Sequence, residues 1–372
     1  MLEGDLDTYN PTLTLNEQAD RLPYKTEYEF PRERLTLEKP LGEGAFGVVM
    51  KGTAIGIVLN ESQTIVGVKM VKNKYDNEAL YALVAELKIM MHLGQHLNVV
   101  NLLGAVTKNI GNRELMVIVE YCPFGNLLNI LRNNRARFID EFNKETITAI
   151  IMESWTSQDT TVPGSSSTES SVSICNRFIS TSDLICWAFQ IANGMNYLTS
   201  RKVLHGDLAT RNVLLSNDNV VKISDFGLSR SLYNETKYKK KTVTPLPVRW
   251  LALESFTDAL FSTHSDVWAY GILLWELFSL GNVPYPGVEI NSEFYKRLRD
   301  GYRLEMPSFS NNIIYDIMLG CWRERPESRP SFRELSSQFK AMLAPETVDY
   351  YLALSEPYVT VNAEYMIPQD TE

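Results

Sequence analysis

The chain has 372 residues, of which 44% are hydrophobic and 22% charged, a composition typical of a globular protein long enough for two packed lobes. The richest apolar run, 269–278, is too short for a membrane helix and contains Glu276, so we predict a buried helix there. Negative charge gathers at the two ends, with net −5 over 1–30 and −6 over 341–372, and the nearly neutral body argues against nucleic-acid binding.

The first third of the chain predicts strands with one helix. Residues 1–30 are polar and acidic, and we predict a linker or docking segment there rather than core. The stretch 35–71 alternates like strands, whereas apolar residues over 77–91 keep helical spacing. Further strand patterns follow at 99–106 and 115–119. Because mostly helical patterns come later, we predict an α+β protein with a small β-rich lobe and a larger helical lobe.

The middle of the chain changes character. Between about 133 and 183 serine and threonine are dense, and we predict a flexible insert that interrupts two patterned regions. A long helix pattern resumes over 184–198. The last substantial helix pattern ends near Leu343, just before Pro345.

A glycine motif lies between two strand patterns near the start of the β-rich region. Gly42, Gly44 and Gly47 belong to it, and no helix pattern follows directly, which argues against a dinucleotide fingerprint. Glycines let a backbone approach phosphates and donate its N–H groups to them. A plain β-turn explains the motif alone equally well.

A lysine and a glutamate follow the glycine motif. Lys69 ends an apolar strand pattern, and Glu86 lies beside the apolar stripe of the predicted helix. A lysine in that place is most often a surface residue with a buried stem. With the glycine motif before them, the two residues suggest an ion pair that holds an ammonium over phosphates.

The run 205–212 carries the most informative chemistry. Asp207 is the candidate base for an incoming hydroxyl, and Asn212 and Asp225 are oxygen ligands suited to Mg²⁺. Two short strand patterns joined by an Asn-Asp-Asn turn predict a hairpin that places Asn212 and Asp225 at one end. The alternative is a surface hairpin in which these acidic residues have no catalytic role.

From roughly Arg21 to Leu343 the sequence resembles a receptor tyrosine kinase of the split-kinase group of vascular endothelial and platelet-derived growth factor receptors, especially their invertebrate relatives. Segments 86–90 and 101–104 carry the likeness together with the motifs above. The resemblance implies a two-lobed protein kinase fold with ATP and Mg²⁺ between the lobes. It divides the chain into a juxtamembrane-like segment at 1–34, a kinase domain at 35–343 with the insert, and an acidic tail at 344–372.

The resemblance also implies roles for single residues. Val119 is similar to the gatekeeper beside the nucleotide, and the next three residues are similar to the hinge that binds adenine. The residues expected around the nucleotide are Leu41, Gly42, Gly44, Gly47, Val49, Lys69, Val119, Glu120, Cys122 and Leu214. Glu254 is expected to pair with Arg329, and Asp266 to anchor the loop that carries the candidate base.

Specificity for tyrosine rests on the residues after Asp207. Ser/Thr kinases usually have lysine where this chain has Ala209, and Arg211 is placed as in receptor tyrosine kinases, where it helps to neutralise the transferring phosphate. Tyr233 and Tyr238 are similar to activation-loop phosphorylation sites, and a phosphate on the second would lie beside lysines. A solvated basic loop is the plainer alternative.

The implied setting is the cytoplasmic side of the plasma membrane, as part of a single-pass receptor that forms a homodimer on activation. Protein tyrosines are the implied substrates. Tyrosines in the tail would dock phosphotyrosine-binding adaptors once phosphorylated, or else belong to a disordered tail.

One residue departs from the family pattern. Gly206 stands where protein kinases usually have the arginine that pairs with an activation-loop phosphate, so the usual coupling of phosphorylation to activity is in doubt. The alternative function is therefore a pseudokinase scaffold that displays phosphotyrosines. Against it stands the full set of catalytic residue types, and a Ser/Thr kinase fits Ala209 and Arg211 poorly.

Overall fold

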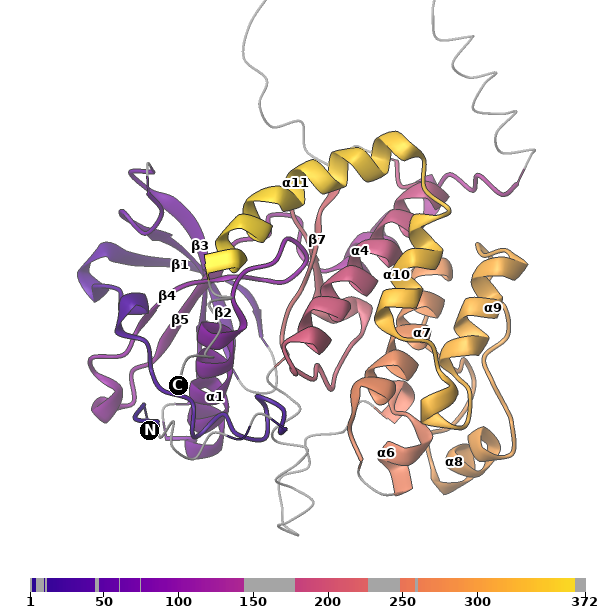
Figure 1. Ribbon diagram of the computed structural model, residues 1–372, viewed down its shortest axis with the longest axis horizontal. Coiled ribbons are helices and arrows are strands. Elements are labelled where there is room, and N and C mark those ends of the chain that lie inside the picture. The colour runs from indigo at the N-terminus through magenta and orange to yellow at the C-terminus, as the bar shows by residue number, and fades with distance from the viewer. Residues whose placement is uncertain are drawn as a thin grey trace, which may run out of the picture.

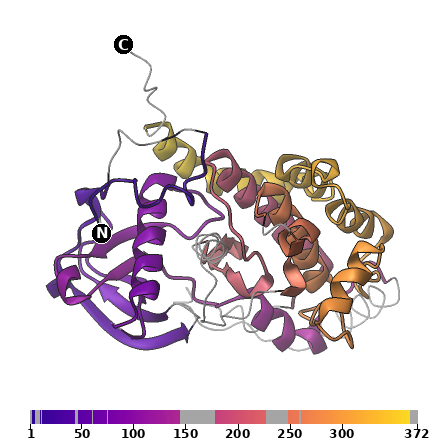
Figure 2. The same cartoon turned by 90° about the horizontal axis from the view of Figure 1, so that it is seen from below.

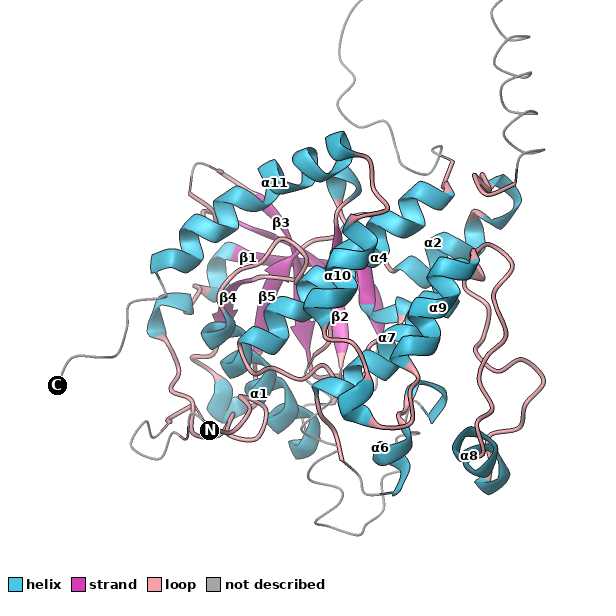
Figure 3. Cartoon of the chain, turned by 45° about the vertical axis from the view of Figure 1, so that its right-hand side comes forward, coloured by secondary structure: helices cyan, strands magenta, loops and turns pink. Residues whose placement is uncertain are grey.

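The computed structural model describes most of the chain, and strands and helices separate into two lobes within it (Figure 1). Figure 3 distinguishes the strands from the helices by colour. The described residues are 2–4, 10, 12–43, 47–59, 61–73, 75–143, 178–226, 248–257 and 260–364. The predicted α+β, two-lobed arrangement is therefore confirmed.

The small lobe is one antiparallel sheet with a helix beside it (Figure 2). Its strands, in spatial order, are β1 (Leu35–Glu43), β2 (Val48–Ala54), β3 (Thr64–Met70), β5 (Met116–Glu120) and β4 (Leu102–Val106). The predicted helix is α1 (Asn77–Leu93), whose first turn is capped by the side chain of Asp76. Its apolar stripe is buried, with Leu80 and Leu87 fully covered.

The large lobe is helical and has α4 and α7 at its centre. Its helices are α2 (Leu127–Asn133), α4 (Thr181–Ser200), α6 (Leu253–Thr257), α7 (Thr263–Phe278), α8 (Ser292–Arg299), α9 (Asn312–Cys321) and α10 (Phe332–Lys340). The apolar run that contains Glu276 forms most of α7 and is buried, as predicted. Within the described residues, no helix combines the length and apolar character that crossing a bilayer requires.

A two-stranded hairpin connects the loop at 205–212 to the rest of the large lobe. Its strands β6 (Val213–Leu215) and β7 (Val221–Ile223) are antiparallel, and Val213 pairs with Ile223. This register confirms the predicted hairpin, because the residues just before β6 and just after β7 must lie at the same end.

The N-terminal segment differs from its prediction. Leu15, Ala19 and Leu22 are buried in the main core, so part of 1–30 belongs to it. The buried Asn16 donates to the carbonyl oxygen of Leu204 at 3.2 Å and accepts from its N–H at 2.9 Å. Polar character misled the prediction, because a side-chain amide is buried at low cost when it pairs with a backbone amide.

The C-terminal prediction was also wrong. The last helix does not end near Leu343: α11 (Pro345–Glu364) follows, begins at a proline, and contains Pro357. In Figure 1 this helix runs from the helical lobe, past α4 and β7, toward the sheet. Proline at the first helical position loses no hydrogen bond, so Pro345 starts a helix where we expected the pattern to stop.

The edges of the predicted insert are structured. The helix expected from Leu184 begins three residues earlier, at Thr181, because Ser180 and Asp183 form a capping box. Ile139 and Ser180 form a bridge, which brings both edges of the insert together on the large lobe. The centre of the insert, 144–177, lies outside the described residues.

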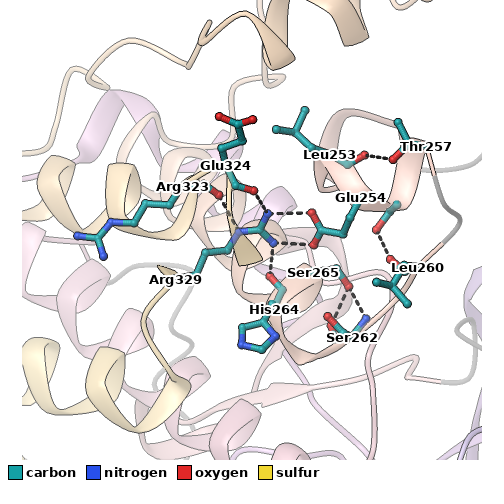
Figure 4. Close-up of polar contacts among 11 residues, drawn as sticks. Leu253, Glu254, Thr257, Leu260, Ser262, His264, Ser265, Arg323, Glu324 and Arg329 are labelled. Carbon is teal, nitrogen blue, oxygen red and sulfur yellow. Dashed lines mark hydrogen bonds and ion pairs between the residues drawn. The ribbon is translucent and has the colours of Figure 1, made fainter. Parts of the chain in front are cut away.

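A buried ion pair joins α6 to the segment that precedes α10 in the large lobe (Figure 4). The guanidinium of Arg329 binds both carboxylate oxygens of Glu254, at 2.7 and 2.8 Å. Its other N–H groups donate to the backbone oxygens of His264, Arg323 and Glu324. All five donors of one arginine are therefore used, and the pairing expected from the sequence is present.

We expect Arg329→Lys to lower the free energy of unfolding by about 2–3 kcal/mol, because lysine offers three donors and cannot match the planar bidentate geometry. Thermal and denaturant unfolding of the purified chain would measure the loss. Arg333→Lys, the same change at an exposed position, is the control and should have almost no effect. Equal losses in the two variants would contradict the role given to this ion pair.

Candidate active site

Three charged side chains meet between the lobes. The ammonium of Lys69, on β3, lies 2.5 Å from Glu86 of α1 and 2.8 Å from Asp225, which follows β7. Lys69 and Glu86 are each about one-eighth exposed, whereas half of the Asp225 side chain is open to solvent. The predicted Lys69–Glu86 pair is present, and Asp225 joins it from the other lobe.

The charges of this trio support one another. Burial would lower the pKa of Lys69, but Asp225 and Glu86 together hold it above its ordinary value. Partial loss of hydration would raise the pKa of Asp225, but the ammonium of Lys69 keeps it below the usual range. The lysine is therefore cationic and the aspartate anionic at neutral pH.

The candidate base lies in the loop before the hairpin. One carboxylate oxygen of Asp207 accepts a hydrogen bond from Arg211, and the other accepts from the Asn212 amide at 2.8 Å. Burial raises the pKa of Asp207 above the ordinary aspartate value, which the charge of Arg211 opposes. The carboxylate is thus held in one orientation at a buried position.

The hairpin brings Asn212 and Asp225 to one place. Ser224 donates to the backbone oxygen of Asn212 from its N–H at 2.9 Å and from its hydroxyl at 3.0 Å. The same hydroxyl lies 3.0 Å from the second carboxylate oxygen of Asp225. Since the side-chain nitrogen of Asn212 donates to Asp207, its side-chain oxygen is the atom that a metal ion could use.

A buried carboxylate shapes the loop backbone. Asp266 of α7 accepts from the N–H groups of His205 and Gly206, both at 2.9 Å, and burial raises its pKa to about 6. Gly206 has a φ of 76°, a conformation that glycine adopts without strain. The contact expected for Asp266 is present.

His205 lies beneath the candidate base. Burial lowers the pKa of His205 to about 4, so the ring is neutral at pH 7. Its Nδ1 accepts from the N–H of Asp207 at 3.2 Å, which leaves Nε2 to donate to the Ser224 oxygen at 3.1 Å. One ring thereby joins the loop that carries Asp207 to the residue before Asp225.

Two of the residues expected around a nucleotide, Val49 and Val119, lie on the sheet that carries Lys69. Val49 is the register partner of Lys69, and Val119 is the partner of Gly67. A methyl group added to Gly67 would lie 3.2 Å from Val119 and 3.8 Å from Val49, so the glycine leaves a small space between them.

The other expected residues vary in exposure. Leu41 of β1 is 43% exposed, a Cβ on Gly42 would meet open space, and a Cβ on Gly47 would clash with the Met70 backbone oxygen. Cys122 is buried after Glu120 at the end of β5, and Leu214 of β6 packs on the core. Gly44, Tyr233 and Tyr238 lie outside the described residues.

Two carboxylates make positioning contacts that sequence reasoning did not predict, although Glu120 itself was expected beside the nucleotide. Glu276 accepts from the Thr210 N–H at 3.1 Å and from the Trp250 indole at 3.0 Å. Glu120 binds Lys222 at 2.8 Å and the Asn101 side chain at 3.0 Å, beside the end of β5. An acid inside the apolar run of α7 was a signal for the first, whereas nothing local marked the second.

Comparisons with known proteins agree with this geometry. The family model described as protein tyrosine and serine/threonine kinase matches residues 35–339. Vascular endothelial growth factor receptor 1 of Homo sapiens is 45% identical over 355 residues, 88% of this chain and 26% of that protein. Receptor 2 of Coturnix japonica is 45% identical over 348 residues, 86% and 26%. Receptor 3 of Coturnix coturnix is 46% identical over 343 residues, 86% and 25%.

The chain spans about a quarter of the length of these relatives. The region matched by the family model, 35–339, contains the site described above. The fold, the ordered motifs and the match over 35–339 agree. The chain therefore belongs to the protein tyrosine and serine/threonine kinase family.

Proposed function

We propose that this chain transfers the γ-phosphoryl group of ATP to the hydroxyl of protein tyrosines, including tyrosines of a second copy of itself. The observation that carries the proposal is the assembled charge arrangement of Lys69, Glu86 and Asp225 opposite Asp207. Membership of the kinase family implies ATP as the phosphoryl donor.

Each side chain has a role that follows from its contacts. Lys69, fixed by Glu86, presents a permanent positive charge to the α- and β-phosphates. Asp207 accepts a hydrogen bond from the tyrosine hydroxyl and takes its proton as the oxygen attacks the γ-phosphorus. Arg211, bound to Asp207, adds positive charge beside the transferring group.

The residues present fit a magnesium ion. Asn212 and Asp225 offer oxygen atoms at one end of the hairpin, and two protein ligands suit Mg²⁺, which keeps waters and binds substrate phosphates. Within the described residues, no group of three or more His, Cys, Asp or Glu side chains forms an all-protein cage. Magnesium would neutralise charge that develops on the phosphates.

Tyrosine rather than serine is the proposed acceptor. Ala209 stands two residues after the candidate base, where Ser/Thr kinases carry lysine. The guanidinium of Arg211 lies 4.4 Å from the ring centre of Trp250, so it is held over an aromatic platform beside Asp207. The matched relatives are named as growth factor receptors, which supports the same assignment.

The proposed setting is the cytoplasmic side of the plasma membrane, within a receptor for an extracellular growth factor. The relatives, four times as long as the matched region, are vascular endothelial growth factor receptors by name. A receptor homodimer would place two such domains together for mutual phosphorylation, and phosphotyrosine-binding adaptors would follow. In this setting Tyr233 and Tyr238 are the proposed activation-loop sites, with Gly206 weakening their coupling to Asp207.

We expect Asp207→Asn and Lys69→Met each to lower the rate of phosphotyrosine formation at least about a hundredfold, because one removes the proton acceptor and the other the phosphate-binding charge. Antiphosphotyrosine detection and mass spectrometry on the purified chain with Mg·ATP would measure it. Lys108→Met, at an exposed lysine, is the matched control and should keep the parent rate.

Three results would contradict the proposal. Phosphoserine alone would contradict the tyrosine assignment, and full activity in Lys69→Met would contradict the ion-pair role. Silence of the parent chain, even when clustered and saturated with ATP, would favour the alternative of a scaffold that displays phosphotyrosines.

We expect activity to fall reversibly below about pH 6, because Asp266 then takes up a proton and binds the loop N–H groups less strongly. The folded pKa of this group lies above its unfolded value, so its protonation stabilises the fold as pH falls. Rate and circular dichroism measured together from pH 8 to 5 would test this. A constant rate across pH 6, or loss of rate only with unfolding, would contradict it.

A further inference from the structure

The helix α11 covers a junction between the two lobes and buries a tyrosine there. Its inward residues recur every three or four positions, as on one face of a helix. These residues are Val348, Tyr351, Leu354 and Tyr358. Tyr350, Leu352 and Val359 are about half exposed or more. The helix therefore docks by a specific face and has a free outer face.

Tyr351 is the central contact of this face. Its side chain is 4% exposed, and its ring packs edge-on against Phe189 of α4, with ring centres 4.9 Å apart. Its hydroxyl donates to the side-chain oxygen of Asn98 and accepts from the amide of Asn193. Asn98 belongs to the segment between α1 and β4, so one phenol joins that segment to the large lobe.

The rest of the Asn98 amide is already engaged. Its nitrogen donates to Gln190 at 3.0 Å and to the Val221 oxygen at 2.9 Å. The oxygen of Asn98 therefore depends on the Tyr351 hydroxyl for a donor, at a position with no exposure to water. Loss of that donor would leave a buried acceptor without its partner.

A second contact holds the far end of α11. The side-chain oxygen of Asn362 accepts from the Gln95 N–H at 3.0 Å, and its amide donates to the Gln95 carbonyl oxygen. A Cβ on Gly94 would lie 2.6 Å from the Asn362 oxygen, so the glycine makes room for this pairing. The helix is thus attached to the α1–β4 segment at two places.

We propose that α11 covers a phosphorylation site, so that Tyr351 accepts a phosphate only after α11 has left this surface and the phosphate then prevents its return. In the step, the oxygen of Tyr351 bonds to the γ-phosphorus of ATP, the bond to the β,γ-bridging oxygen breaks, and ADP leaves. The proton passes to the catalytic base of the kinase that acts on it.

Two physical reasons make the docked and phosphorylated states exclude each other. Phosphorylation removes the hydrogen that the Asn98 oxygen accepts and places phosphate oxygens against it. It also adds a charge of about −1.5 to −2 beside Phe189, Asn98 and Asn193, which are uncharged. The docked helix, in turn, cannot give Tyr351 to a kinase, because its hydroxyl is buried between two side chains.

The inference goes beyond the proposed function. It rests on that function only if a second copy of this chain is the kinase that phosphorylates Tyr351. Its test therefore uses the whole chain with Lys69→Met, which removes its own activity, and an added soluble tyrosine kinase with Mg·ATP. Mass spectrometry measures phosphate on Tyr351. The chain also carries Tyr350→Phe, so that only one of the two adjacent tyrosines can be phosphorylated. The free 345–364 peptide with the same substitution gives the rate without docking.

Two matched substitutions separate docking from local sequence. Leu354→Asp places a charge on the inward face, and Leu352→Asp places the same charge on a side chain that is 48% exposed. We expect the first to raise the rate at Tyr351 at least about tenfold, toward that of the peptide, and the second to leave it within about twofold. Hydrogen exchange over 345–364 in the same samples reports release of α11.

Hydrogen exchange measured after phosphorylation tests whether the phosphate on Tyr351 prevents α11 from docking again. We expect fast exchange over α11 in the chain phosphorylated on Tyr351, and slow exchange in a Tyr351→Phe chain treated with the same kinase. Tyr351 reacting in the docked chain as fast as in the peptide would overturn the proposal. Slow phosphorylation of Tyr351 in a Leu354→Asp chain whose α11 shows fast hydrogen exchange would also overturn it. So would slow hydrogen exchange over α11 in that variant, or continued protection of α11 from exchange after Tyr351 is phosphorylated.

Discussion

The contact of Lys69 with Glu86 and Asp225 is the interaction on which the rest of the site depends. It joins a strand, a helix and the end of a hairpin that are far apart in sequence. A buried ammonium without partners would be costly. The charge of Lys69 is neutralised only when α1 and the hairpin are placed so that both carboxylates reach it. Any movement of α1 that takes Glu86 away leaves the lysine with half of its counter-charge.

A second constraint acts on the loop that carries the candidate base. Apart from a single 3-10 turn at Thr210–Asn212, this loop has no regular secondary structure, so several of its N–H groups need acceptors from elsewhere. Asp266 supplies two and Glu276 supplies a third, both from α7. Burial raises the pKa of each of these acids, which is the cost of placing a carboxylate where the loop backbone needs an acceptor.

The two ends of the chain show how polar segments can belong to a folded body. Asn16 and Asn362 each pair with a backbone amide, and Tyr351 satisfies a buried side-chain oxygen. In a sequence such residues count as polar, and the few apolar positions between them form only short patterns. A prediction from hydrophobic periodicity therefore misses segments that are held by a few specific hydrogen bonds.

The sequence alone determined the elements whose signals are local. Helical spacing identified α1, and a three-residue turn fixed the neighbourhood of Asn212 and Asp225, because a hairpin needs only its own residues to form. Tertiary structure decided which carboxylate meets which N–H group, and that α11 buries Tyr351 against Asn98. Contacts between residues so far apart in sequence depend on how whole elements pack against one another. Local sequence patterns do not predict this packing.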